Sequence, residues 1–196
     1  IVDLFNREVV AWLISQRPDA RLCSDTLLIL SKTHDLHGAI IHGDQGSGYI
    51  SWEYRDTIVQ LGAVQSCTKT DRCWENANME SFNGVLKTEC LYNRFGKSRF
   101  NSRRVRKTDV LDAVVNFIPY YNEIRLKEDL GWLSPVEYRQ ANIKGTLPVP
   151  IGIDRLKKGA GCQQVLTKQD CYPDWEQRAI LVSPQLGALG LESVTS

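Results

Sequence analysis

Apolar and polar positions along the first 140 residues switch between two periods, which predicts strands and helices in alternation. Two apolar, β-branched stretches, 1–5 and 9–14, flank the polar Asn6-Arg7-Glu8 and predict a hairpin. Short apolar runs at 39–41 and 63–68 predict two further strands. The sequence therefore predicts at least four strands in this part of the chain.

Helical spacing of apolar residues predicts the remaining elements. The predicted helices follow Pro18-Asp19, follow the capping residue Ser51, run from Asn76 to Cys90, and run from Thr108 to about Tyr121. Gly62 should stop the second helix, and Pro119 should kink the last one or end it early. The order of elements predicts an α/β fold in which helices cover a sheet.

After Gln140 the periodic pattern ends. Residues 141–196 hold four of the seven prolines and six of the fourteen glycines. We expect a domain over 1–140 and a loosely ordered, irregular tail over 141–196 that adds little to the core. The first residues read as the middle of a strand, with neither an initiator Met nor a signal peptide, which predicts a chain truncated at its front.

Composition excludes some classes of protein. Hydrophobic residues make up 42% and charged residues 24%, which excludes wholesale disorder, and no apolar run reaches the roughly 20 residues of a membrane span. Six cysteines without metal-site spacing favour reduced thiols in a cytosolic protein. The net charge of +1 does not indicate a class of binding partner, but the segment from Arg94 to Lys107 contains seven basic residues and no acidic residue. This segment is either a solvated loop or an anion-binding patch.

Two carboxylates stand where chemistry is expected. Asp44 follows a buried strand and opens a glycine-rich loop, a usual place for functional groups in α/β sheets, although such an Asp can equally bond its own turn. Glu80 lies on a polar helical stripe, which is either a solvated face or a metal ligand beside groups that touch phosphates. The stripe comprises Asn76, Glu80, Asn83, Gly84 and Lys87. Gly84 costs the helix about 1 kcal/mol relative to Ala, and close approach of a bulky ligand would explain it.

Several segments resemble one family. Residues His42–Tyr49, Cys73–Phe82 and Leu86–Glu89 resemble the integrase core of bacterial insertion-sequence transposases, which are related to retroviral integrases. Thirty-five residues separate Asp44 from Glu80, the spacing of the Asp-Asp-Glu transposases. Val2–Val10 matches the family's early hairpin, and Tyr121–Arg125 with Leu130–Pro135 matches its closing segment. The resemblance covers about residues 1–139.

The resemblance implies an RNase H-like fold, a mixed sheet flanked by helices, and DNA strand transfer that depends on Mg²⁺ or Mn²⁺. It implies that Asp44 and Glu80 are the second and third catalytic carboxylates and metal ligands. The expected DNA contacts are Asn76, Asn83, Lys87, Arg103, Arg104, Arg106 and Lys107. The family's first catalytic Asp lies on a strand upstream of the hairpin, so we expect a sheet missing its first strand and a chain inactive alone. Asp3 matches a hairpin position outside the triad.

The resulting hypothesis is a transposase or integrase core that acts in DNA integration and transposition, as a partial or degenerate copy. One alternative is a non-catalytic DNA-binding or assembly protein derived from a transposase, and another is an RNase H-like nuclease. Expected partners are the element ends and target DNA, further copies of the chain on DNA, and a separate helix-turn-helix protein of the same element. The expected location is the bacterial cytoplasm, at the nucleoid, without a membrane partner.

Overall fold

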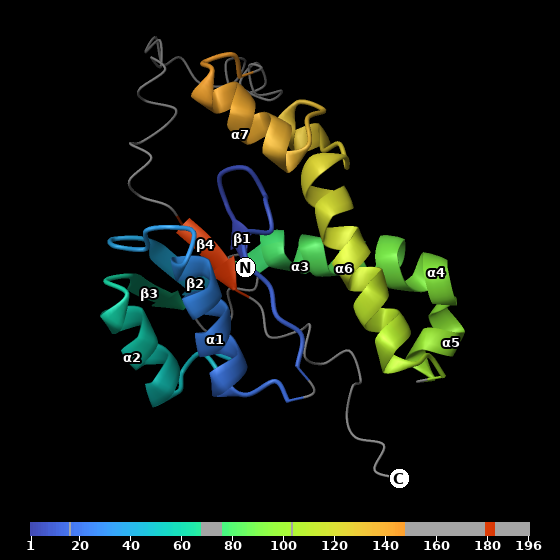
Figure 1. Ribbon diagram of the computed structural model, residues 1–196, viewed down its shortest axis with the longest axis horizontal. Helices are drawn as coiled ribbons and strands as arrows, with labels where there is room; N and C mark the ends of the chain where they lie inside the picture. Colours follow the sequence, from blue (N-terminus) through green and yellow to red (C-terminus); the bar gives the residue numbers. More distant parts are fainter. Residues whose placement is uncertain (16, 68–75, 103, 148–178, 183–196) are drawn as a thin grey trace, which may run out of the picture.

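A four-stranded mixed sheet forms the centre of the protein in the computed structural model, which describes residues 1–15, 17–67, 76–102, 104–147 and 179–182 (Figure 1). Its strands are β1 (Val2–Asp3), β2 (Ile40–Gly43), β3 (Val64–Cys67) and β4 (Ala179–Val182). The spatial order is β1-β4-β2-β3. β2 runs parallel to both β3 and β4, whereas β1 runs antiparallel to β4.

The predicted N-terminal hairpin is present, but its second arm is not a continuous strand. Val2 and Val9 form an antiparallel bridge, and the Asp3 amide donates to the Glu8 carbonyl at 2.9 Å. On the other side, the Asn122 side chain donates to the Val9 carbonyl and accepts from the Val9 amide, each at 2.9 Å. The backbone of Val9 is thus engaged by a helix side chain instead of a neighbouring strand.

The first two helices begin at the predicted caps. α1 (Ala20–Ser31) starts after Asp19, whose carboxylate accepts from the Leu22 amide, and α2 (Trp52–Gln60) starts after Ser51, whose hydroxyl accepts from the Tyr54 amide. Gly62 follows α2 with a φ of 65°, a conformation that glycine adopts without strain. These local predictions are confirmed.

The later helices extend beyond their predicted ends. They are α3 (Ala77–Val85), the π-helix η2 (Leu86–Tyr92), α4 (Asn93–Phe95), α5 (Lys97–Asn101), α6 (Lys107–Glu123), the 3-10 helix η3 (Glu128–Leu130) and α7 (Pro135–Ile143). α6 continues through Pro119, so the prediction of an early end is wrong. Pro119 removes one backbone donor, which the packing of the surrounding helix tolerates. None of the helices in the described ranges is long and apolar enough to cross a membrane.

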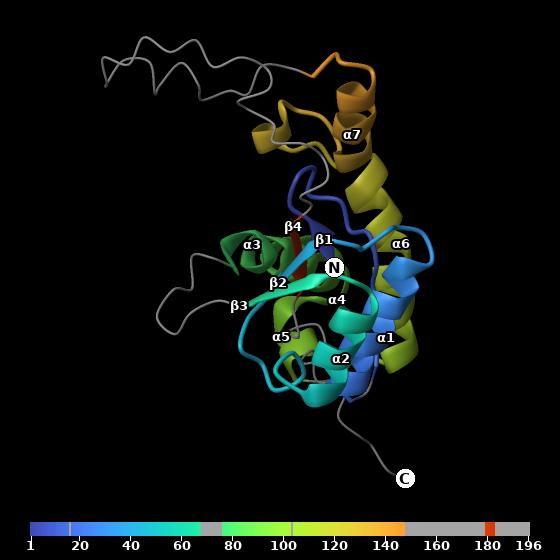
Figure 2. The same ribbon diagram turned by 90° about the vertical axis from the view of Figure 1, so that its left-hand side faces the viewer.

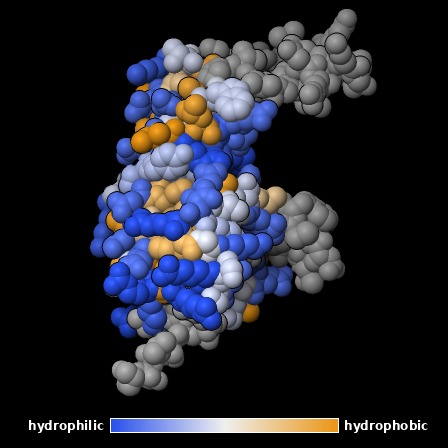
Figure 3. All heavy atoms as spheres, turned by 90° about the vertical axis from the view of Figure 1, so that its right-hand side faces the viewer, coloured by the Kyte–Doolittle hydropathy of each residue, from blue (hydrophilic) through white to orange (hydrophobic). Residues whose placement is uncertain are grey.

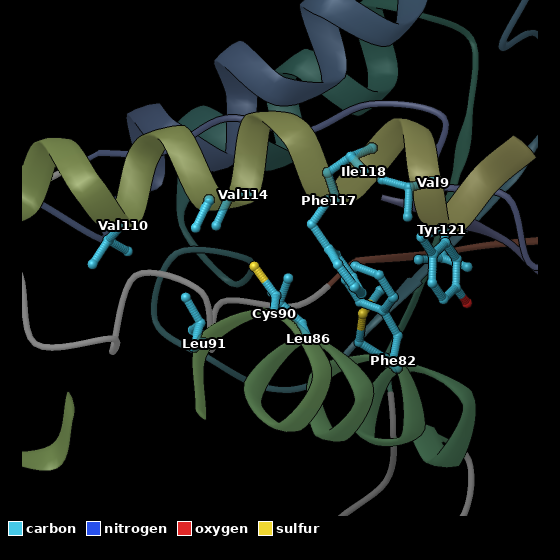
Figure 4. Packing of buried hydrophobic residues seen from close by; sticks show 13 residues of the cluster. Val9, Phe82, Leu86, Cys90, Leu91, Val110, Val114, Phe117, Ile118 and Tyr121 are labelled. Atoms are coloured by element: carbon cyan, nitrogen blue, oxygen red, sulfur yellow. The ribbon is translucent and has the colours of Figure 1, made fainter. Parts of the chain in front are cut away.

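Helices lie on both faces of the sheet (Figure 2), and an apolar cluster fills the space on each face. Ile1 and Ile41 pack with α1 and α2 on one face, whereas Val2 and Val9 pack with α3, η2 and α6 on the other. Because adjacent strand residues point to opposite faces, Ile1 and Val2 enter different clusters. Figure 4 shows the second cluster, where the Phe82 and Tyr121 rings meet edge to face with centroids 5.1 Å apart.

The strand β4 departs from the expected domain division. We expected residues 141–196 to stay outside the core, but Ala179–Val182 lies in the sheet between β1 and β2. These four apolar residues are too few to show a period, which is why the pattern did not reveal them. α7 also ends at Ile143, beyond the expected boundary at 140. Residues 148–178 and 183–196 lie outside the described part of the chain.

Candidate functional site

Asp44 lies directly after the last residue of β2 and is half-buried. Its Oδ1 atom accepts a hydrogen bond of 2.8 Å from the Gly46 amide, so the turn interaction expected of an Asp at this place is present. The second carboxylate oxygen has no hydrogen-bond partner among the described residues. Asp44 therefore has one oxygen engaged in its own loop and one available for a ligand.

The loop after Asp44 is fastened to α1. A Cβ atom at Gly48 would stand 2.8 Å from the Cys23 sulfur, so this glycine is required by packing and not by a ligand. Burial raises the pKa of the Cys23 thiol to about 11, and the charges of Asp19 and Asp44 add to this rise. Burial likewise raises the pKa of Tyr49. Both groups are neutral at pH 7, so they hold the loop and supply no nucleophile.

Glu80 stands on the exposed side of α3, one turn from its beginning. The same helix buries Met79 and Phe82 in the core, as its periodicity predicts. No hydrogen bond or ion pair joins the Glu80 carboxylate to another residue in the described ranges. It is therefore open to solvent or to a ligand.

The two amides of the polar stripe are not presented to a ligand as expected. Asn83 is 4% exposed and Asn76 is 7% exposed, while Lys87 is half-buried. At about 100° per residue, Asn83 and Asn76 lie about 40° and 60° from Met79, whereas Glu80 lies about 100° away. The amides thus form the buried margin of the stripe. Glu80 is therefore exposed and Lys87 is partly exposed, whereas the side chain of Asn83 is covered by the surrounding structure.

One polar atom beneath Glu80 is left without a partner. The Asn76 Oδ1 atom is buried and makes no hydrogen bond within the described structure, and Asn76 does not cap α3 with its side chain. Buried acceptors of this kind are uncommon and call for an explanation such as an ion or a water molecule. At Gly84, a Cβ atom would meet nothing within 4 Å, so packing within the described chain does not require glycine there.

Asp44 and Glu80 are carried by elements on two sides of β4. α3 contacts β4, and the parallel partner of β4 is β2, whose last residue precedes Asp44. Within the described ranges, no three His, Cys, Asp or Glu side chains gather into a group that could hold a metal ion. The available donors are therefore hard carboxylate oxygens of the type that Mg²⁺ prefers, but two residues leave most of its ligands to water or to substrate.

The basic segment does not lie where the sequence suggested. We expected Arg94–Lys107 to adjoin the carboxylates, but Figure 1 places α4 and α5 on the opposite side of the molecule from β2 and β3. Residues 77–92 form a continuous helical segment in which α3 passes into η2, and this segment leads the chain to α4. Figure 3 shows mostly hydrophilic side chains in the lower part of this far side. The expectation of a shared edge is corrected accordingly.

Ion pairing changes the charge that this segment offers. Arg106 is 83% exposed and binds Asp109 through two hydrogen bonds of 3.0 and 3.1 Å. Arg104 is exposed, and Lys107 is half-buried as the first residue of α6. Arg103 lies outside the described residues. Arg104 and Lys107 are thus available to an anion, whereas Arg106 is held by a neighbouring carboxylate.

An ion pair that the sequence did not reveal joins two of the motif segments. Arg125 binds Glu89 through two hydrogen bonds of 2.7 Å. This pairing lowers the pKa of Glu89 and raises that of Arg125. The sequence offered one signal for this contact, because Glu89 and Arg125 carry opposite charges and both lie in segments that resemble the same family. Since 35 residues separate them, the sequence pattern alone did not predict that they meet.

Comparisons with known proteins identify the family. Two integrase core domain models match residues 1–73 and 80–143. The InsK protein of insertion sequence element IS150 from Escherichia coli is 33% identical over 140 residues, which are 71% of this chain and 47% of that protein. The transposase of insertion sequence element IS904 from Lactococcus lactis is 32% identical over 142 residues, 72% of this chain and 53% of that protein. The chain spans about half the length of these relatives.

A solved structure supports the fold independently. A chain of the simian T-cell lymphotropic virus intasome aligns with a TM-score of 0.51 at 17% identity, covering 70% of this chain and 46% of that one. The expected α/β, RNase H-like architecture is thereby confirmed. Two domain models, two transposon proteins and a shared fold all point to one assignment: the chain belongs to the integrase core family of insertion-sequence transposases.

Proposed function

We propose that this chain is the DNA-acting core of an insertion-sequence transposase, and that it serves DNA integration and transposition by metal-dependent phosphoryl transfer. The observation that carries the proposal is the placement of Asp44 and Glu80, 35 residues apart in sequence, on elements that flank the same strand. The relatives from Escherichia coli and Lactococcus lactis, both proteins of insertion sequences, supply the class of reaction.

Asp44 and Glu80 are the residues that would hold Mg²⁺ or Mn²⁺. Their carboxylates are hard donors, and each has at least one oxygen without a partner in the described structure. The buried, unpartnered Asn76 Oδ1 atom supports a polar ligand or ordered water near the start of α3. When bound, such a cation polarises a phosphoryl oxygen and stabilises the charge that develops on it.

DNA binding would rest on two separate surfaces. Near the carboxylates, the open position at Gly84 and the amine of Lys87 allow a phosphate backbone to approach α3. On the far side, Arg104 and Lys107 offer contacts to phosphates that do not depend on base sequence. Because α4 and α5 lie on the opposite side of the molecule from β2 and β3, the two surfaces would engage different stretches of DNA or different DNA molecules.

The wider assembly follows from the same proposal. Partners would be element ends, target DNA and further copies of the chain, with a separate helix-turn-helix protein of the element, in the bacterial cytoplasm at the nucleoid. A second candidate, a non-catalytic DNA-binding or assembly protein, is favoured by one observation. The described residues supply two carboxylates and no third metal-ligating group beside them.

A cleavage and joining assay tests the proposal. The chain is incubated with supercoiled plasmid and a labelled oligonucleotide, with Mn²⁺ or Mg²⁺ and with a chelator. The transposase function predicts nicking and joining that both Asp44→Asn and Glu80→Gln abolish, while Glu53→Gln on the exposed part of α2 leaves them unchanged. Binding without cutting would support the non-catalytic candidate, and cutting without joining would indicate a nuclease.

A further inference from the structure

β4 is the strand that joins the two parts of the sheet in the described structure. β1 pairs with β4, and β2 pairs with both β3 and β4. All other described elements come from residues 1–147, whereas Ala179 follows Leu147 after an intervening stretch of 31 residues. A segment distant in sequence therefore completes a sheet that the rest of the chain leaves divided.

The position that β4 fills has the width of one strand. Neighbouring strands lie about 4.8 Å apart, so β1 and β2 face each other across about 9.6 Å. Without β4, the facing amides and carbonyls of Val2–Asp3 and Ile40–Gly43 would lack their ladder partners. Unpaired strand edges of this kind bind extended polypeptide readily.

The surroundings define which segment fits. Apolar clusters lie on both faces of the sheet, which favours an apolar segment as the incoming strand. The strand in this position, β4, pairs parallel to β2, with Ile40 opposite Ala179 and Gly43 opposite Val182. It pairs antiparallel to β1, with Val2 opposite Leu181. The sequence Ala179-Ile180-Leu181-Val182 meets these conditions.

We propose that the slot between β1 and β2 is a strand-binding site, that Ala179–Val182 is a displaceable ligand of it, and that the same segment of a second copy of this chain is the partner that fits. Four residues form a short strand, and their tether of 31 residues extends to about 100 Å. This length is enough to span the distance to a second molecule, although at low protein concentration the segment meets its own sheet far more often. The proposal is independent of the transposase function.

Exchange of β4 would act on the candidate site. The last parallel pair of β4, Val182 with Gly43, lies one residue before Asp44. The main-chain bonds of this pair hold the end of β2, from which the loop carrying Asp44 departs. Gly43 also pairs with Cys67 of β3, so release of β4 would leave that end of β2 paired on one side only. Occupancy of the slot would therefore affect how firmly the position of Asp44 is held.

Cysteine cross-linking in the full chain tests the proposal. In the Val2→Cys, Leu181→Cys variant the two thiols lie on paired residues, and mild oxidation should link them, which peptide mass mapping distinguishes from links of the natural cysteines. In dilute solution the link should join residues of one molecule, and the share of covalent dimers should rise with protein concentration. The Phe5→Cys, Leu181→Cys variant, out of register, should not cross-link.

A competing peptide tests whether the strand is displaceable. A synthetic peptide of residues 177–184, at a millimolar concentration that matches a tethered segment, should lower the 2–181 link several-fold. A link that the peptide leaves unchanged and that never appears between molecules would overturn the exchange. Absence of the link at every concentration would overturn the site itself. The Asp3→Cys, Ile180→Cys pair gives the same readout if the first variant does not fold.

Discussion

Arg125 and Glu89 form a bidentate ion pair: Nε of Arg125 lies 2.7 Å from Oε2 of Glu89, and Nη2 of Arg125 lies 2.7 Å from Oε1 of Glu89. Both side chains are only partly exposed. Glu89 belongs to η2, the continuation of the helix that bears Glu80, and Arg125 follows the end of α6. The pair thus connects the helix that bears Glu80 to the end of α6, the longest helix in the described part of the chain.

Removing the ion pair between Arg125 and Glu89 should destabilise the fold. We expect Arg125→Ala to lower the free energy of unfolding by about 1–2 kcal/mol, because a partly buried carboxylate loses both of its donors. Denaturant titration monitored by circular dichroism measures the change. The matched control is Arg21→Ala, whose pair with Asp25 is largely exposed and should contribute less than about 0.5 kcal/mol. An equal decrease in the free energy of unfolding in both variants would show that the ion pair between Arg125 and Glu89 contributes no more than an exposed one.

The same pair predicts a dependence of stability on pH. The Arg125 guanidinium holds the pKa of Glu89 below its ordinary value of 4.5, so the contribution is present above about pH 4.5 and is lost as the pH falls through the lowered pKa. The stability difference between the natural chain and Glu89→Gln should therefore shrink below pH 4.5. In an Arg125→Ala background this pH-dependent difference should disappear, and its persistence there would assign it to another group.

Metal binding should require both candidate ligands. We expect weak binding of Mn²⁺, measured by titration calorimetry, and a loss of at least about tenfold in affinity in Asp44→Asn and in Glu80→Gln, because each supplies one of two carboxylates. Glu53→Gln serves as the control for general loss of negative charge. Retention of full affinity in Glu80→Gln would separate this residue from the metal site.

DNA affinity should depend on salt through the basic segment. Each phosphate contact adds about 0.9 to the slope of log K against log salt, so the Arg104→Ala, Lys107→Ala double variant should flatten the slope by about 1.8. Including Arg103 and Arg106 in a quadruple Ala variant should weaken binding to all DNA sequences alike. Lys32→Ala, at the residue that follows α1, is the control.

The ion pair of Arg106 gives a second and opposite test of this segment. Asp109 occupies the Arg106 guanidinium through two hydrogen bonds. Asp109→Asn should release the cation and steepen the salt slope by up to about 0.9, as measured by fluorescence anisotropy with labelled duplex. Unchanged slopes in this variant and in the double Ala variant would mean that the segment is a solvated surface.

Local chemistry was predictable from the sequence, and long-range placement was not. Asp19 and Ser51 mark helix starts because their side chains bond backbone amides a few residues away. The core face of α3 also follows from its period. The turn bond of Asp44 belongs to the same local class.

The incorrect predictions all depend on contacts between residues that are more than one helix turn apart in the sequence. A wheel diagram separates polar from apolar residues but does not say how far the core extends around the helix, so Asn83 looked accessible and is buried. The spacing of apolar residues within one helix cannot show that α3 and η2 place Arg94–Lys107 away from β2 and β3. Nor can it show where Ala179–Val182 pairs, since strand pairing is decided by non-local contacts.

The central position of β4 has a consequence for synthesis. Because Val2 pairs with Leu181, one contact spans almost the full length of the chain, and such contacts slow folding by the entropy of closing a long loop. On the ribosome, the sheet remains divided until residues 179–182 have left the exit tunnel, after nearly every other element has been made. During that interval two facing strand edges are exposed on each nascent chain, so the need for chaperone protection lasts until β4 has been made and has paired.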